Sequence, residues 1–173
     1  MYTGTYRIAG RSIAIESLYP DVHAYCAAYR HAGDPDFTIR ITPADIARER
    51  DKSAREDQRQ GIAPRAFPEG YLEELAVYRQ IADRMPAYDT LLIHGSAIAL
   101  DGAAYLFTAR SGKGKSTHTR FWRQTFGSRA VMINDDKPLV GLTDAGAVIY
   151  GTPYNGKHRL GENLSAPLKS HFG

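Results

Sequence analysis

Nine consecutive residues, 109–117, have the composition of a phosphate-binding loop: ARSGKGKST. In such a loop, backbone N–H groups surround phosphate oxygens, a lysine ammonium reaches the outer phosphates, and the next hydroxyl binds Mg²⁺. The strict pattern GxxxxGK[S/T] has glycine at the position of Ala109, so the match is one residue short, and alanine adds only a methyl group. A Gly- and Lys-rich surface turn is the alternative. The pattern predicts that nucleotide phosphates bind Ser111, Gly112, Lys113, Gly114, Lys115, Ser116 and Thr117.

Two adjacent carboxylates follow the next apolar segment, 130–133, which we interpret as a buried strand ending at Asn134. Mg²⁺ prefers hard oxygen ligands, and a kinase that acts on a hydroxyl also benefits from a group that accepts the hydroxyl proton. We assign Asp136, together with Ser116, to the metal and Asp135 to the acceptor. The reverse assignment stays open, and so does a simple polar turn between strands.

Two further side chains are candidates for the chemistry. His94 ends the apolar segment 91–93, where it has either a structural role or a contact with phosphate or acceptor. The segment 151–159 combines Gly, Pro and Asn with a ring and cationic side chains, so we interpret it as a loop able to close over a triphosphate, or as an ordinary basic loop. Lys157 or Arg159 would neutralise charge on the transferred group. The predicted catalytic residues are Asp135, His94 and Lys157.

The elements that must position these residues are strands before the loop and a helix after it. Apolar segments 98–100 and 104–107 flank Asp101-Gly102, a strong hairpin signal. A helix is expected from Ser116 to Phe126, with Gly127 as its stop. A second hairpin is expected to join 139–142 to 147–150.

The first half of the chain predicts a different set of elements. We expect a hairpin over 6–17, a short helix over 21–29, a strand over 36–42, a helix capped by Thr42, and a core-facing helix ended by Pro86. The fold class is therefore α/β with α+β character. Residues 1–88 are expected to form an elaboration packed on a nucleotide-binding core, residues 89–173.

Composition excludes several functional classes. The 173 residues contain one cysteine, Cys26, which permits no internal disulfide and suits a reducing, cytoplasmic location. No stretch approaches the roughly 20 apolar residues that span a bilayer, so we expect no membrane partner. The formal charge is +3, but the basic residues are spread among acids, which argues against nucleic-acid binding.

The order of these motifs resembles that of HPr kinase/phosphorylase and phosphoenolpyruvate carboxykinase. The resemblance rests on His94-Gly95-Ser96-Ala97, then 111–117, then Asn134-Asp135-Asp136. Bacterial HPr-kinase-like proteins of unknown substrate resemble the chain further, at 71–73, 114–119, 134–138 and 151–153. Lys113 stands where relatives commonly carry a small or apolar residue. Relatives usually continue beyond the point where this chain stops, which implies a partial acceptor site.

The resemblance implies a P-loop core on a mixed, largely antiparallel sheet, with ATP or GTP and Mg²⁺ as cofactors. We expect a kinase that transfers a phosphoryl group to a hydroxyl of a protein, peptide or small molecule. A catalytically silent nucleotide-binding regulatory module is the alternative. The expected partners are the nucleotide, an unknown phosphoryl acceptor and a second copy of the chain in a homo-oligomer.

Overall fold

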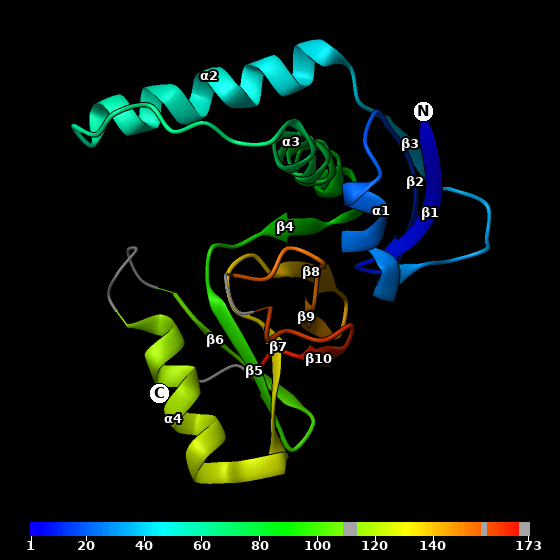
Figure 1. The fold of residues 1–173 in the computed structure, drawn as a ribbon. Coiled ribbons are helices and arrows are strands. Elements are labelled where there is room, and N and C mark those ends of the chain that lie inside the picture. Colours follow the sequence, from blue (N-terminus) through cyan, green and yellow to red (C-terminus); the bar gives the residue numbers. More distant parts are fainter. Residues whose placement is uncertain (109–113, 157–158, 170–173) are drawn as a thin grey trace. The chain divides into compact units, whose positions relative to one another are not determined.

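The computed structural model describes residues 1–108, 114–156 and 159–169. They belong to two compact units, Met1–Asp83 and Arg84–Gly173, and each unit is described by itself (Figure 1). Both units combine helices with sheets, and all strand pairs but one are antiparallel. The predicted α+β character is therefore confirmed. None of the described helices is both long and apolar enough to cross a membrane.

The first unit contains a three-stranded sheet and helices. Its elements are β1 (Tyr2–Ile8), β2 (Arg11–Ser17), α1 (Asp21–Tyr25), a 3-10 helix (Ala27–Tyr29), β3 (Phe37–Arg40), α2 (Pro43–Arg59) and α3 (Glu69–Arg84). β1 and β2 form the expected hairpin, and β3 pairs parallel with β2. Ala9 and Gly10 at the hairpin turn both have positive φ, 47° and 77°, as a type I′ turn requires.

Helix α2 begins where the sequence predicts. The Thr42 hydroxyl accepts from the backbone N–H of Asp45, and the Asp45 carboxylate accepts from the backbone N–H of Thr42 at 2.9 Å. This reciprocal pair is a capping box, and Pro43 at the first helical position lacks an N–H that would need a partner. Further along α2, the buried Glu49 forms an ion pair with Arg79 of α3.

A fully buried carboxylate, Glu73, joins α3 to the end of β2. It accepts hydrogen bonds from the backbone N–H groups of Leu18 at 2.6 Å and Tyr19 at 2.9 Å. Burial raises the pKa of Glu73, and these two hydrogen bonds partly oppose that rise. The carboxylate thus supplies partners to a chain segment that leaves the sheet and has no strand neighbour there.

The second unit contains two antiparallel sheets and one long helix. Its elements are a 3-10 helix (Met85–Tyr88), β4 (Thr90–Leu92), β5 (Ser96–Leu100), β6 (Ala103–Phe107), α4 (Lys115–Phe126), a 3-10 turn (Gly127–Arg129), β7 (Ala130–Asn134), β8 (Leu139–Thr143), β9 (Gly146–Tyr150) and β10 (Ser165–Pro167). The strand orders are β6-β5-β7 and β10-β9-β8-β4. Both expected hairpins are confirmed, whereas β10 was not predicted.

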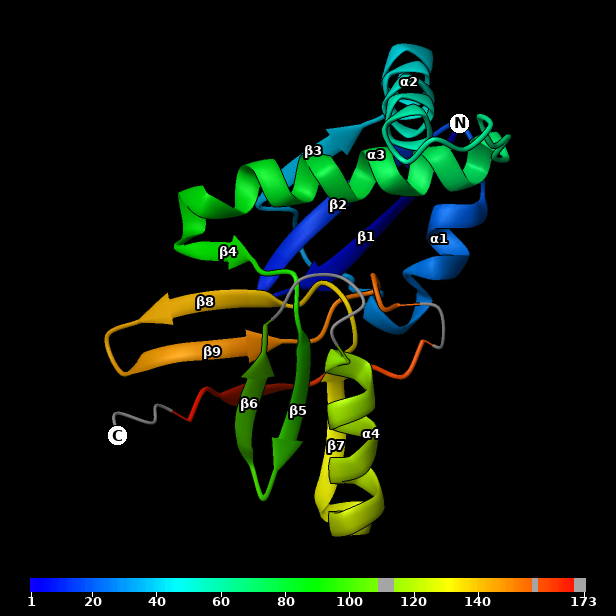
Figure 2. The same ribbon diagram turned by 90° about the vertical axis from the view of Figure 1, so that its left-hand side faces the viewer.

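The three-stranded sheet of this unit has two different faces. On one face Ile98 and Met132 pack with Trp122 and Phe126 of α4. On the other, Ala97, Ala99 and Ile133 pack with Val140 and Ile149 of the second sheet. Alternate residues of a strand point to opposite faces, so β5 serves both layers. Figure 2 shows α4 running beside β7, with β8 and β9 on another side of β5 and β6.

Replacement of Glu73 by glutamine should destabilise the chain, because one backbone N–H would face an amide NH₂ in a buried place. We expect a loss of about 1–3 kcal/mol in the free energy of unfolding. Chemical denaturation measures it. Asp83→Asn, at an exposed position near the end of the same helix, is the matched control. Equal stability of the two variants would contradict a supporting role for Glu73.

A pH dependence should arise from His23, whose ring nitrogens lie 2.6 Å from the Tyr6 hydroxyl and 2.8 Å from the Ser17 hydroxyl. Burial lowers the pKa of His23 below its ordinary value of 6.5. The unfolded chain then binds more protons than the folded chain as the pH falls below 6.5, so stability declines there. Denaturation series between pH 7.5 and 5 should show a flatter profile for His23→Gln; an unchanged profile would assign the decline to other groups.

Candidate functional site

The pairing of β5 determines where the candidate residues meet. β5 runs antiparallel to both of its neighbours, with Ser96 opposite Phe107 and Ala97 opposite Asn134. Phe107 is the last residue of β6 and Asn134 the last of β7. The chain therefore leaves β6 towards the candidate loop, and β7 towards the two carboxylates, at the same edge of the sheet.

Part of the predicted site lies outside the described residues. This holds for Ser111, Gly112 and Lys113 of the candidate loop and for Lys157. The loop's last residues are described: Gly114 precedes α4 with a φ of 86°, and Lys115, Ser116 and Thr117 form the first turn of that helix. The positive φ favours glycine at this position. The N–H groups of a first helical turn lack intrahelical acceptors, and the helix dipole favours an anion there.

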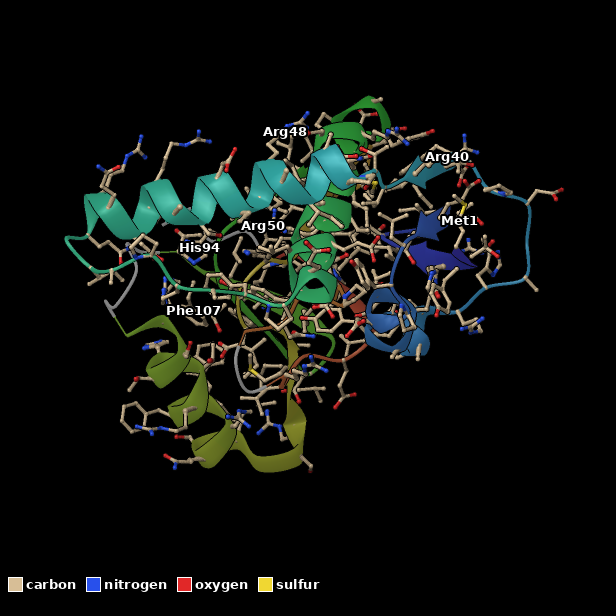
Figure 3. All side chains as sticks on the ribbon, turned by 45° about the horizontal axis from the view of Figure 1, so that its top comes forward. Met1, Arg40, Arg48, Arg50, His94 and Phe107 are labelled. Atoms are coloured by element: carbon tan, nitrogen blue, oxygen red, sulfur yellow. The ribbon has the colours of Figure 1, made fainter. Side chains whose placement is uncertain are left out.

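The aromatic side chains around the two ends of the candidate loop form one cluster. The Phe107 ring lies 4.5 Å from the His118 ring between centroids, and the Trp122 indole N–H donates to His118 Nε2 at 3.2 Å. Figure 3 labels Phe107, which lies beside α4. Trp122 is the chain's one tryptophan, so its fluorescence reports on this region.

Asn134 organises the turn that carries the carboxylates. It is fully buried, and its Oδ1 accepts from the backbone N–H groups of Asp136 at 2.9 Å and Lys137 at 2.7 Å. Its Nδ2 donates to Thr152 Oγ1 at 2.9 Å and to the carbonyl of Tyr154 at 3.3 Å. The sequence analysis gave Asn134 no role. An Asn between an apolar strand and a turn was the available signal, because its side chain readily bonds backbone N–H groups two residues on.

Asp136 lies between a histidine side chain and a lysine side chain. Its Oδ1 is 3.3 Å from His94 Nε2, and its Oδ2 is 3.7 Å from the Lys137 ammonium. The backbone N–H of Gly95 donates to the Asp136 carbonyl at 3.0 Å, which fixes the His94 segment beside the turn. The structure thus brings together two predicted residues that are 42 positions apart in the sequence, His94 and Asp136.

Asp135 has different surroundings. Its Oδ1 accepts a hydrogen bond from the Ser96 hydroxyl at 2.7 Å. The Ser96 oxygen also lies 3.1 Å from the hydroxyl of Thr119, on α4, and both hydroxyl-bearing residues are buried. Asp135 is therefore connected to the helix that begins at Lys115. The sequence analysis missed both Ser96 and Thr119 as contributors to the site.

The segment after β9 passes against the carboxylate turn. A Cβ added to Gly156 would lie 3.4 Å from the carbonyl oxygen of Asp135 and 3.6 Å from the Cβ of Asp136. The segment lacks regular structure, as expected, but residues 151–154 are buried rather than exposed, and Asn134 holds Thr152 and Tyr154. Arg159 is exposed.

A metal at this site would be held by few protein ligands. Among the described residues no group of three or more His, Cys, Asp or Glu side chains is arranged to hold a metal. Mg²⁺ in nucleotide sites is usually bound by one or two carboxylates together with phosphate oxygens. The assignment of Ser116 and Asp136 to Mg²⁺ therefore stays a prediction.

Neither a family model nor a curated protein matches the chain.

Substitutions at Asn134 should separate its two roles. Asn134→Asp keeps the acceptor for the turn but loses the donor to Thr152 and Tyr154, whereas Asn134→Ala loses both. We expect a loss of about 1–3 kcal/mol in unfolding free energy for the aspartate variant, and a larger loss for the alanine variant. Hydrogen exchange at the backbone amides of Thr152 and Tyr154 should rise in both variants, and at those of residues 136 and 137 only in Asn134→Ala. The same exchange pattern in both variants would contradict this division.

Proposed function

We propose that the chain is an ATP- and Mg²⁺-dependent kinase domain of the HPr kinase/phosphorylase-like type. It would transfer a phosphoryl group from ATP or GTP to a hydroxyl of a protein, a peptide or a small molecule. Its second unit, whose described sheets are antiparallel, would be the P-loop core.

The observation that carries the proposal is the position of the carboxylate turn. Asp135 and Asp136 follow β7 at the edge where β6 ends, and Asp135 is linked through Ser96 to Thr119 near the start of α4. Phosphoryl transfer requires little covalent chemistry from the protein, because catalysis consists mainly of positioning and electrostatic stabilisation. Carboxylates beside a phosphate-binding helix start supply both a metal ligand and a proton acceptor.

Each residue would have a separate role. Lys115 would bind the outer phosphates, and the N–H groups of residues 112–116 would surround them. Ser116 and Asp136 would hold Mg²⁺, which would supply positive charge to neutralise the phosphates. Asp135, assisted by His94, would orient the acceptor hydroxyl and accept its proton as the new oxygen–phosphorus bond forms and the bond from the γ-phosphorus to the departing nucleoside diphosphate breaks. Lys157 would neutralise charge on the transferred group.

A catalytically silent nucleotide-binding module is the second candidate function. The contacts of Asp136 favour it, because His94 and Lys137 already lie near its two carboxylate oxygens. If these contacts persist with nucleotide present, the carboxylate would not become a metal ligand, and binding would occur without transfer.

Calorimetric titration with Mg²⁺ and ATP, followed in parallel by Trp122 fluorescence, tests the nucleotide site. Lys115→Ala should weaken binding by about tenfold to a hundredfold, since it removes a charge-assisted contact to phosphate. Lys169→Ala, an exposed lysine on the same unit, should bind as the parent does. Absence of binding by the parent, or equal binding by the Lys115 variant, would show that the assignment is wrong.

Transfer of label from γ-labelled ATP, in the presence of a lysate of the source cell, tests the kinase activity. We expect Asp135→Asn to retain nucleotide binding and to lose transfer, because the proton acceptor is removed. Asp136→Asn should require more Mg²⁺ for half-maximal binding of ATP. Nucleotide binding without any transfer by the parent chain would instead support the silent module.

A further inference from the structure

Two buried hydroxyl groups lie between the Asp135 carboxylate and helix α4. Ser96 is fully buried at the start of β5, and Thr119 is 1% exposed, one turn into α4. The Ser96 Oγ atom lies 2.7 Å from Asp135 Oδ1 and 3.1 Å from Thr119 Oγ1. The three side chains therefore form a hydrogen-bonded series that runs from the end of β7 through β5 to α4.

The number of hydroxyl protons determines which group is the donor in each of these hydrogen bonds. Ser96 has one hydroxyl proton, and a carboxylate only accepts, so that proton belongs to the bond with Asp135. Thr119 must then be the donor in its contact with Ser96. The Thr119 hydroxyl also lies 3.2 Å from the carbonyl of Ser116, which provides a second acceptor in the first turn of α4.

The packing around Ser96 does not explain why this buried residue has a hydroxyl group. Ser96 lies on the same face of β5 as Ile98, which packs in the apolar layer beneath α4. A buried hydroxyl in such a layer is unfavourable unless it is hydrogen-bonded. A small apolar residue would satisfy packing alone, so the contact with Asp135 is what the serine provides.

We propose that Ser96 and Thr119 are positioning residues that fix the Asp135 carboxylate relative to the first turn of α4. This inference rests on the proposed kinase function and adds to it. Ser96 holds Oδ1, and Oδ2 faces the acceptor hydroxyl. The protein, rather than the bound substrate, then sets the distance between the proton-accepting oxygen and the phosphates above α4.

The first test separates nucleotide binding from the rate of transfer. In Ser96→Ala the KM for ATP should stay within about twofold, while kcat falls by about tenfold to a hundredfold, as expected for a misplaced reacting group. If no phosphoryl acceptor has been identified, both constants are measured for ATP hydrolysis, in which water is the acceptor. Thr119→Val should lower kcat less than Ser96→Ala does. Thr119→Ser should have the kcat of the parent protein, because the hydroxyl group of residue 119 is needed and its methyl group is not.

Matched controls exclude a general effect of removing hydroxyls. Ser165 on β10 and Thr125 on α4 are exposed, so Ser165→Ala and Thr125→Val should leave both kinetic constants unchanged. An unchanged kcat in Ser96→Ala would overturn the inference. A raised KM with an unaltered kcat would overturn it as well, since Ser96 would then support nucleotide binding and not the position of Asp135.

A second measurement requires no activity. Denaturation midpoints are compared for Thr119→Val, Asp135→Ala and the double variant. The same three variants are then measured in a protein that also carries Ser96→Ala. The two substitutions should be non-additive with Ser96 present and additive in Ser96→Ala, because Ser96 carries their coupling. Additivity with Ser96 present would overturn the inference by itself. If the parent binds no nucleotide, the kinase proposal fails. The stability measurements still decide whether Ser96 couples Thr119 to Asp135.

Discussion

The antiparallel pairing of β5 with both β6 and β7 is the constraint on which the candidate site depends. Because β5 is the central strand and is antiparallel to both neighbours, the ends of these neighbours lie at the same edge, although 26 residues separate Phe107 from Asn134 along the chain. This pairing places the end of β6, which precedes the candidate loop in the sequence, beside the end of β7, which precedes the carboxylate turn. The apolar layers on the two faces of the sheet, one against α4 and one against β8 and β9, keep that edge in place.

The protein interior next to this edge of the sheet contains polar side chains at positions where packing alone would favour apolar side chains. Asn134, Ser96 and Thr119 are all buried, and each forms hydrogen bonds that define a single arrangement of its neighbours. Such bonds add little net stability, because the unfolded chain forms equivalent bonds with water. Their effect is on geometry: a misplaced partner would leave a buried group unsatisfied, which is costly. The site is thus held by a few directional contacts in an otherwise apolar unit.

Local features of the fold were readable from the sequence, whereas its long-range contacts were not. Asp101-Gly102 predicts a hairpin because both residues must adopt positive φ, and Thr42 predicts a helix start through its capping geometry. The alternation of apolar and polar residues predicts β3 as a strand, but its parallel pairing with β2, and the short strand β10, depend on partners distant in sequence. The same holds within the site. The sequence gives Asp135 and Asp136 as neighbours, but their separate partners follow only from the sheet.

Those partners give the two carboxylates different chemical character. Asp136 lies near His94 and the Lys137 ammonium, whereas Asp135 accepts a hydrogen bond from a neutral hydroxyl. A divalent ion attracts a carboxylate more strongly than a single ammonium at the same distance, since the Coulomb energy scales with charge. Within the proposed function, Asp136 would therefore hold Mg²⁺ in place of these weaker partners, and His94 would be available to orient the acceptor. Asp135, fixed by Ser96, would not need to move. The assignment of Asp136 to the metal and Asp135 to the acceptor is thus the one that requires the smaller rearrangement of buried groups.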